Sequence, residues 1–246
     1  MSGNNLHNKL ILITGGGSGI GLASAKRFLG EQARVVIVGR DKEKLNEAAR
    51  FLNGGDRLMW HAADAADINQ VLNLVNSIHA ACGPVDILVN NAGANIKERT
   101  IRELTPERWR YLIGANLDSA YNCIHAVLPQ MVQRQSGLII NISSISGKRA
   151  NPLGGPAYAA AKFGMAALGI ALGAEEKDNG IRVCNIYPGE VDTPILKNRP
   201  KPVTEQHRQS ILKPEHVAEA VLFIAKLPPQ ATVPELVITP ASQAYI

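Results

Sequence analysis

The stretch KLILITGGGSGIG, residues 9–21, decides the fold class, because a β-branched apolar run leads directly into a glycine-rich turn. A helical pattern begins at about Ile20. Between a strand and a helix, Gly15 allows a tight turn, Gly19 lets the backbone approach a phosphate, and Gly21 permits close helix packing. A merely flexible turn is the alternative, but the flanking strand and helix favour a nucleotide site. We expect this turn to contact a cofactor through Gly15, Gly17, Ser18, Gly19, Ile20 and Gly21.

The same alternation of strand and helix continues along the chain. Helical patterns separate the apolar runs, and the longest of them cover 106–134 and 155–176. The later runs lie at 34–39, 57–62, 86–91, 137–143, 181–189 and 235–239. Seven strands alternating with helices predict an α/β fold: a doubly wound parallel sheet with helices on both faces. We expect one domain over 1–246, in which the Pro-, Lys- and Arg-rich segment 190–213 is a loop over the substrate.

Composition narrows the class of protein. Hydrophobic residues make up 46% and charged residues 19% of 246, which excludes a disordered chain and suits a soluble globular one. The net charge of +5 comes from scattered Lys and Arg, so no nucleic-acid partner is expected. The chain shows no signal-peptide pattern and no apolar run of eighteen residues, so neither export nor a membrane is expected. Cys82, Cys123 and Cys184 are too widely spaced for a metal site or a disulfide framework, which favours reduced thiols in the cytoplasm. The histidines show no metal-ligand spacing, and no metal is predicted.

The end of the second expected strand indicates the type of dinucleotide. An acid at this place would bind the adenosine ribose of NAD, but here Gly39 is followed by Arg40. A guanidinium binds a 2′-phosphate that an acid would repel, so NADP(H) is favoured, with NAD(H) as the alternative. Arg40 could instead be a solvated residue that opens a helix. Ser18 also stands where a second basic residue would be expected.

Motifs along nearly the whole chain resemble those of the short-chain dehydrogenase/reductase family. In order they are TGGGSGIG at 14–21, NNAG at 90–93, Asn116, ISS at 142–144, YAAAK at 158–162 and YPGEVDT at 187–193. The resemblance implies a Rossmann-type sheet of seven parallel strands and a nicotinamide cofactor. It also implies that Asp64 meets the adenine amine, that Asn91 lines the cofactor cleft, and that a segment after the sixth strand holds the nicotinamide carboxamide. The residues of that segment are Pro188, Gly189, Val191 and Thr193.

Each of these cofactor residues has a structural alternative. Asp64 could cap a helix, Asn91 could be a buried amide that ties strands together, and Pro188–Gly189 could form an ordinary turn. Their position at the carboxyl ends of successive strands favours the cofactor, because open α/β sheets bind ligands at that edge.

The resemblance further implies a catalytic set of Asn116, Ser144, Tyr158 and Lys162. Tyr158 would be the acid/base, Ser144 would hold the substrate oxygen with Ser143 as the runner-up, and Asn116 would anchor a water. Tyr158 and Lys162 are four residues apart and share one helical face. A cation about 6 Å from the phenol, at an effective dielectric of about 20, favours phenolate by roughly 3 kcal/mol, or about two pKa units. Lys162 alone would therefore bring the phenol only part of the way to neutral pH.

Together these features predict an NADP(H)-dependent oxidoreductase that interconverts a secondary alcohol and its ketone. The ending LPPQATVPELVITPASQAYI resembles that of reductases acting on 3-hydroxy acids, which favours a small hydroxy acid. Basic residues of the 190–213 segment could attract such an acid, or could simply be solvated: Lys197, Arg199, Lys201, Arg208 and Lys213. The alternatives are a 3-oxoacyl carrier-protein reductase and a dinucleotide-binding sensor without turnover. Apolar residues on more than one side of the helix with Tyr158 predict a homodimer or homotetramer.

Overall fold

All seven predicted strands form, and they join in one parallel sheet. The computed structural model describes residues 5–243. The strands are β1 Leu10–Thr14, β2 Arg34–Gly39, β3 Leu58–Ala62, β4 Ile87–Asn90, β5 Gly137–Ile142, β6 Ile181–Pro188 and β7 Glu235–Ile238. Their order across the sheet is β3-β2-β1-β4-β5-β6-β7, and every neighbouring pair is parallel. The prediction of a doubly wound, Rossmann-type α/β fold is confirmed.

The strand order reverses direction between β1 and β4. From β1 the chain moves outward through β2 to β3, and then crosses back to β4 on the other side of β1. The two connections that leave this point run to opposite faces, which opens a crevice at the carboxyl ends of β1 and β4. The glycine-rich turn follows β1 directly and therefore lies at that crevice.

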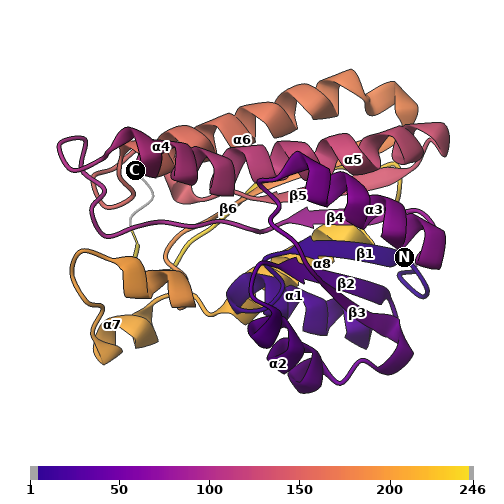
Figure 1. The fold of residues 1–246 in the computed structure, drawn as a ribbon, viewed down its shortest axis with the longest axis horizontal. Helices are drawn as coiled ribbons and strands as arrows, with labels where there is room; N and C mark the ends of the chain where they lie inside the picture. Colours follow the sequence, from indigo (N-terminus) through magenta and orange to yellow (C-terminus); the bar gives the residue numbers. More distant parts are fainter. Residues whose placement is uncertain (1–4, 244–246) are drawn as a thin grey trace.

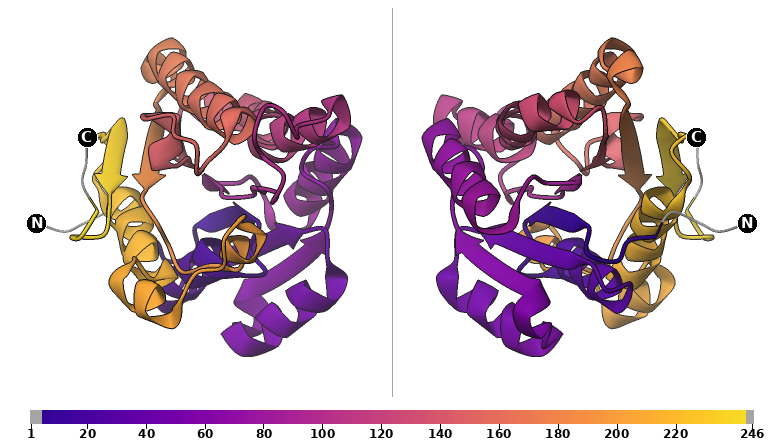
Figure 2. Two further views of the ribbon diagram at one scale, coloured as in Figure 1. Left: turned by 90° about the vertical axis from the view of Figure 1, so that its left-hand side faces the viewer. Right: turned by 90° about the vertical axis from the view of Figure 1, so that its right-hand side faces the viewer.

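Helices cover both faces of the sheet (Figures 1 and 2). The first face carries α1 Gly19–Gly30, α2 Lys42–Leu52 and α8 Pro214–Lys226. The second face carries α3 Ile68–Cys82, α4 Pro106–Ile113, α5 Ser119–Gln133 and α6 Pro156–Glu175. Successive β1 residues point to opposite faces, so Ile11 and Ile13 enter one buried cluster while Leu10 and Leu12 enter the other. This double burial is why the strands are continuous apolar runs.

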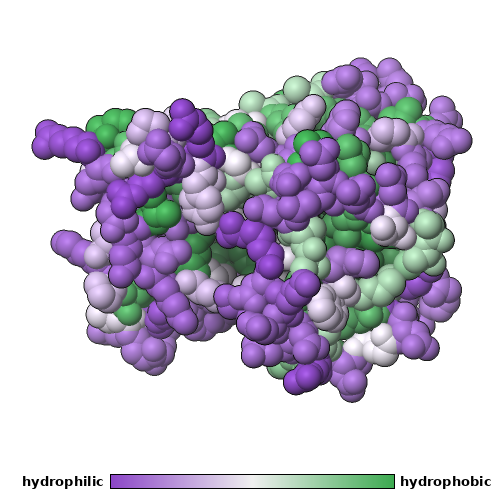
Figure 3. All heavy atoms as spheres, in the orientation of Figure 1, coloured by the Kyte–Doolittle hydropathy of each residue, from purple (hydrophilic) through white to green (hydrophobic). Residues whose placement is uncertain are grey.

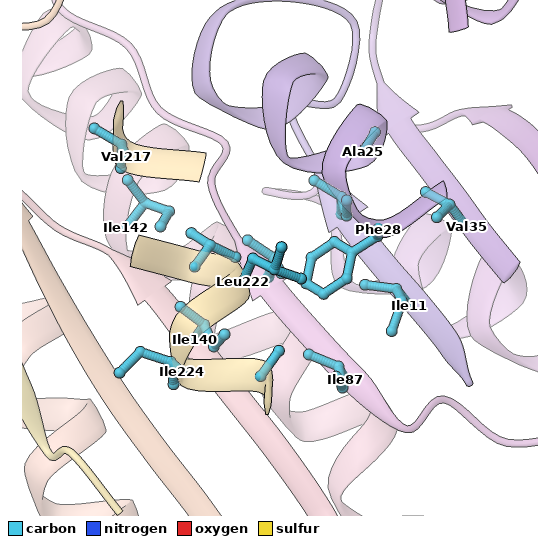
Figure 4. Close-up of a cluster of buried hydrophobic side chains, with 14 of the residues drawn as sticks. Ile11, Ala25, Phe28, Val35, Ile87, Ile140, Ile142, Val217, Leu222 and Ile224 are labelled. Carbon is cyan, nitrogen blue, oxygen red and sulfur yellow. The ribbon is translucent and has the colours of Figure 1, made fainter. Parts of the chain in front are cut away.

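The core under α1 and α8 is centred on aromatic and branched side chains. Phe28 of α1 and Leu222 of α8 point toward each other above Ile11 and Ile87 of the sheet (Figure 4). Phe28 and Ile11 have no exposed surface. Burying an aromatic or leucine side chain stabilises a fold by about 1.5–3 kcal/mol, so this cluster holds α1, and with it the glycine turn, against the sheet.

The helical pattern over 106–134 is not one helix. It divides into α4 and α5 at a π-helical turn over Gly114–Asp118, and Asn116 lies inside that turn. The side-chain Nδ2 of Asn116 donates to the Leu112 carbonyl at 2.8 Å and to the Ala94 carbonyl, also at 2.8 Å. The extra residue of a π turn is a feature often found at functional sites, and here it aims one side chain at a neighbouring loop.

The segment 190–213 is more ordered than the loop that we expect from its composition. It contains a 3-10 turn at Pro194–Asn198 and the short helix α7 Glu205–Ser210. Three of its basic residues are ion-paired rather than free: Arg199 with Glu190, and both Arg208 and Lys213 with Asp192. Two local acids, Glu190 and Asp192, thus balance two of the five positive charges that the sequence suggests.

Two further sequence expectations concern thiols and membranes. Cys82, Cys123 and Cys184 are all free. α6 is long and apolar enough to cross a membrane, but a core helix of a soluble protein can have the same length and composition. The N-terminal stretch for which we expect no signal peptide begins with four residues that lie outside the described part of the chain. The last three residues of the C-terminal motif LPPQATVPELVITPASQAYI also lie outside it.

Candidate active site

A cavity of about 730 Å³ opens at the carboxyl ends of the central strands, within the usual range for ligand clefts. A hollow lies on this face of the molecule, between the part that carries α7 and the part that carries α1 and α2 (Figure 3). Among the residues that line the cavity, Glu190 is the single acid, against five basic side chains. These are Arg40, Lys44, Arg99, Lys162 and Arg199. The cavity therefore suits anionic ligands.

The glycine turn forms a cradle at one side of the cavity. Gly15 and Gly19 have φ of +65° and +53°, values that favour glycine. A Cβ on Gly21 would lie 2.4 Å from the Gly15 carbonyl oxygen, so the first turn of α1 packs directly on the loop. Gly15, Ser18, Gly19 and Ile20 line the cavity, whereas Gly17 and Gly21, which we also expected to contact the cofactor, do not. The cradle fits a pyrophosphate.

Asn91 ties the strand after the switch point to this cradle. Its Nδ2 donates to the Thr14 carbonyl at 2.9 Å and to the Gly15 carbonyl at 3.2 Å. Its backbone N–H donates to Thr14 Oγ1 at 3.0 Å. These bonds match the structural alternative for Asn91, and the residue also lines the cavity. Asn91 therefore sets the shape of the glycine turn from the β4 side.

Arg40 lies at the far end of the cavity with half of its side chain exposed. Its Nη2 donates to the Tyr111 hydroxyl at 3.4 Å, and this bond is the largest cause that raises the pKa of Arg40. Asp64 lies 4.0 Å from its Nη1 and accepts from the Ala66 N–H, but Asp64 is not among the cavity-lining residues. Lys44 does line the cavity. Sequence reasoning missed Lys44, which lies in the first turn of α2, directly after the loop that carries Arg40.

Tyr158 and Lys162 share one face of α6, as their spacing predicts. The Lys162 Nζ lies 5.8 Å from the centroid of the Tyr158 ring. Lys162 is buried, with 3% of its surface exposed, and its Nζ donates to the Ile142 carbonyl at 2.9 Å. Both residues line the cavity. The amine is thus held beneath the phenol at the end of β5.

The two serines of the ISS motif have different partners. Ser143 is buried, and its hydroxyl donates to the Lys162 carbonyl at 3.1 Å. Ser144 accepts from the Ser146 N–H at 3.1 Å, and its hydroxyl is near enough to the Tyr158 phenol to lower the pKa of that phenol. The geometry therefore brings Ser144 to the phenol and leaves Ser143 as a link between β5 and α6.

The electrostatics at Tyr158 differ from the sequence-based argument. Burial raises the pKa of Tyr158, while the Ser144 hydrogen bond and the positive charge of Arg99 lower it. Lys162 Nζ lies 5.8 Å from the centroid of the phenol ring, close to the separation of about 6 Å used in the sequence-based estimate. Burial lowers the pKa of Lys162 itself to about 7, so its amine carries a full charge only below neutral pH. Arg99, which sequence reasoning missed, is the permanent cation near the phenol.

Asn116 reaches the same region from the π-helical turn. It has no exposed surface, and its Oδ1 accepts from the Ala94 N–H at 3.2 Å. A Cβ on Gly93 would lie 2.8 Å from Asn116 Oδ1 and 3.5 Å from Lys162 Nζ. The glycine of the NNAG motif thus lets the asparagine and the lysine approach the backbone between them.

The segment after β6 closes the cavity against the glycine turn. All four residues that the resemblance assigns to the nicotinamide line the cavity: Pro188, Gly189, Val191 and Thr193. A Cβ on Gly19 would lie 3.1 Å from the Thr193 Cγ2. A ligand in the cradle would therefore be in contact with this segment as well.

Three asparagines form a ladder across the sheet beneath the site, which sequence reasoning also missed. Asn90, Asn141 and Asn185 stand side by side in register on β4, β5 and β6, each no more than 1% exposed. Asn90 donates to Asn141 at 3.0 Å, Asn141 to Asn185 at 2.9 Å, and Asn185 to the Ala166 carbonyl of α6 at 3.0 Å. The ladder fixes α6, and so Tyr158 and Lys162, to the central strands.

Comparisons with known proteins agree with this geometry. The family described as short chain dehydrogenase matches residues 9–203. A 3-oxoacyl-[acyl-carrier-protein] reductase of Chlamydia muridarum is 36% identical over 231 residues, 89% of this chain and 91% of that protein. A cis-4-hydroxycyclohexanecarboxylate dehydrogenase of Sinomonas cyclohexanicum is 35% identical over 223 residues, 88% of this chain and 89% of that protein. The solved closed form of a serine dehydrogenase complexed with NADP+ is 30% identical, with a TM-score of 0.88 and 96% of both chains covered.

Proposed function

The chain belongs to the short-chain dehydrogenase family of oxidoreductases, and we propose that it uses NADP(H) to interconvert two small acids. One is a hydroxy acid whose hydroxyl group is secondary, and the other is the corresponding keto acid. One observation carries the proposal. The Tyr158 phenol, its Ser144 partner and the buried Lys162 amine lie in the same cavity as the glycine cradle. Hydride transfer at the carbonyl carbon and proton transfer at the carbonyl oxygen can therefore take place on the same substrate group.

The residues present fit the dinucleotide. Gly15, Ser18, Gly19 and Ile20 would bind the pyrophosphate, and Thr193 with its neighbours would hold the nicotinamide end. When bound, NADP(H) supplies or accepts the hydride. Asp64 and Asn91 take supporting roles in this proposal, Asp64 beside Arg40 and Asn91 behind the glycine turn.

The chain's own side chains would manage the proton. Tyr158 gives its phenolic proton to the carbonyl oxygen during reduction and removes the hydroxyl proton during oxidation. Ser144 donates to the same substrate oxygen and holds it beside the phenol. Lys162 would bind the nicotinamide ribose. Asn116 would anchor a water that connects the Lys162 amine to solvent, so that the phenol can be reprotonated.

The preference for NADP(H) rests on two cations at the far end of the cavity. Arg40 and Lys44 both line it there, and a guanidinium can bind a 2′-phosphate with two parallel hydrogen bonds. Arg40→Asp should shift selectivity from NADP(H) toward NAD(H), measured as the ratio of kcat/KM values. Arg50→Asp makes the same charge change on an exposed part of α2 and serves as the control. Unchanged selectivity in Arg40→Asp would overturn this part of the proposal.

Two observations support a hydroxy acid as substrate. The cavity has five basic lining residues and one acidic one. Two of the similar proteins are named for hydroxyl compounds that carry a carboxylate, serine and cis-4-hydroxycyclohexanecarboxylate. The relative named 3-oxoacyl-[acyl-carrier-protein] reductase provides the second candidate, an acyl chain on a carrier protein.

A substrate panel tests the proposed function. Hydroxy acids, neutral secondary alcohols and a 3-oxoacyl thioester are each offered with NADP(H) and NAD(H), and the absorbance of the reduced nicotinamide is followed. We expect NADP(H)-dependent turnover of hydroxy acids or their keto acids. Turnover of the thioester alone would favour the carrier-protein reductase. Dinucleotide binding without turnover of any compound would favour a sensor.

We further propose that a second copy of this chain covers the outer side of α5 and α6. Large apolar side chains are exposed there: Tyr121 at 50%, Phe163 at 43% and Ile170 at 53%. A homodimer or homotetramer would bury them. Sedimentation that shows only a monomer would remove this proposal. The three free thiols support a cytoplasmic location.

A further inference from the structure

Arg99 is a buried cation without an acid to balance it. Only 5% of its surface is exposed, and no carboxylate among residues 5–243 lies within ion-pair distance of its guanidinium. Burying a charge is costly unless a partner compensates it, and carbonyl oxygens satisfy N–H groups without supplying a negative charge. The other guanidinium of this part of the cavity, Arg199, is already paired with Glu190 at 3.2 Å.

The Arg99 side chain is held in one position by three separate segments. Its Nε donates to the Ile96 carbonyl at 2.6 Å and its Nη1 to the Leu153 carbonyl at 2.8 Å, while Nη2 donates to the Asn198 carbonyl. Gly155 has a φ of +79°, and a Cβ there would lie 2.7 Å from the Arg99 carbonyl oxygen. The loop before α6 is therefore shaped to receive this arginine.

Two of the five guanidinium N–H groups have no partner among these carbonyls. The side chain of Arg99 lines the cavity, and its positive charge lowers the pKa of the Tyr158 phenol. A fixed guanidinium with spare donors, near the proton-transfer group, has the chemistry that binds a carboxylate. The other cavity cations are occupied elsewhere, since Arg40 and Lys44 lie at the dinucleotide end and Lys162 lies beneath the phenol.

We propose that Arg99 binds the carboxylate of the substrate and so selects hydroxy acids over neutral alcohols. This proposal rests on the proposed function, because it concerns the substrate of the same site. A purely structural role, in which Arg99 only links three loops, makes a different prediction: loss of the guanidinium would then affect charged and neutral substrates equally.

The test compares acids with their uncharged amides. The 2-, 3- and 4-hydroxy acids of four or five carbons with a secondary hydroxyl, and the matching hydroxy amides, are offered to wild type, Arg99→Gln and Arg99→Lys. Wild type should prefer at least one acid to its amide. Arg99→Gln should raise the KM of that acid by about 10- to 100-fold and change the KM of the amide less than about threefold. Arg99→Lys should recover part of the loss, because it keeps the charge without the fork.

Arg102→Gln is the matched control, since Arg102 is an exposed residue of the same loop that does not line the cavity. It should behave as wild type. Equal KM changes for acid and amide in Arg99→Gln, or no preference for any acid in wild type, would overturn the assignment.

A binding measurement covers the case in which Arg99→Gln does not fold. Calorimetry on the wild-type NADP+ complex should show tighter binding of butanoate than of butanamide, and equal binding of the two would count against Arg99. The two proposals can also fail separately. Turnover of neutral alcohols without preference for acids overturns the carboxylate site alone. Preferred binding of butanoate that is lost in Arg99→Gln, without turnover of any alcohol, overturns the oxidoreductase proposal alone.

Discussion

Replacing Lys162 with methionine should stabilise the folded protein while it removes activity. Burial lowers the pKa of Lys162 from its ordinary 10.5 to about 7. Each pKa unit corresponds to about 1.4 kcal/mol, so burial of the charged amine costs about 5 kcal/mol at pH 6. Methionine has a similar length and no charge, but it leaves the Ile142 carbonyl without its Nζ donor, at a cost of about 1–3 kcal/mol. Lys162→Met should therefore be more stable than wild type by about 2–4 kcal/mol at pH 6.

The pH dependence of this difference identifies its cause. The folded-state pKa of Lys162 lies below the unfolded-state value, so the unfolded chain binds more protons between about pH 7 and pH 10.5. The stability of wild type relative to the variant must then rise with pH across that window. By pH 9 the cost of burying Lys162 has fallen to about 2 kcal/mol, so the advantage of the variant should shrink by about 3 kcal/mol.

Urea unfolding of both proteins without added dinucleotide, at pH 6 and at pH 9, measures the difference directly. Lys177→Met, which removes an exposed lysine, should show no such change with pH. If Lys162→Met is no more stable than wild type at pH 6, or if the difference does not narrow by pH 9, then the amine is not desolvated as the structure indicates.

Three other substitutions test the parts of the site. Gly21→Ala places a Cβ within 2.4 Å of a carbonyl oxygen of the glycine turn, so NADPH affinity in a fluorescence titration should fall at least about tenfold; an unchanged dissociation constant would refute the cradle. Ser144→Ala should lower kcat by about 100-fold or more with little change in Tm. Ser143→Ala should cost about 1 kcal/mol of stability and leave kcat within a few-fold. If steady-state kinetics show the larger loss of kcat in Ser143→Ala, then Ser143 and not Ser144 holds the substrate oxygen. Asn141→Leu removes the middle of the asparagine ladder, and urea unfolding should show a loss of about 2–5 kcal/mol; a loss under about 1 kcal/mol would show that the ladder does not hold α6.

The parts of the fold that could be predicted are those with a local signal. The apolar runs that became β1 and β2 are buried on both faces, and their composition shows it directly. The positive φ of Gly15 and Gly19 follows from a turn that only glycine fits easily. Tyr158 and Lys162 share a face because their spacing matches the helix period.

The parts that could not be predicted depend on tertiary contacts. The π-helical turn at Asn116 keeps the helical pattern of the sequence and differs only by one residue in its hydrogen bonding. Arg99 looks like an ordinary loop arginine until three loops supply its carbonyl partners. The alignment of Asn90, Asn141 and Asn185 requires the strand register, which no single segment contains.

The role of the Tyr158 phenol is the central claim, and Tyr158→Phe tests it most directly. The variant keeps the ring and removes only the hydroxyl, and Tyr121→Phe makes the same change at a position of α5 that does not line the cavity. NADPH affinity and turnover are measured on both variants with the best substrate of wild type. We predict that Tyr158→Phe binds NADPH within about twofold of wild type and loses about 100-fold or more in kcat, as expected for loss of the acid/base. Turnover near the wild-type rate in Tyr158→Phe, with Tyr121→Phe unaffected, would contradict the account.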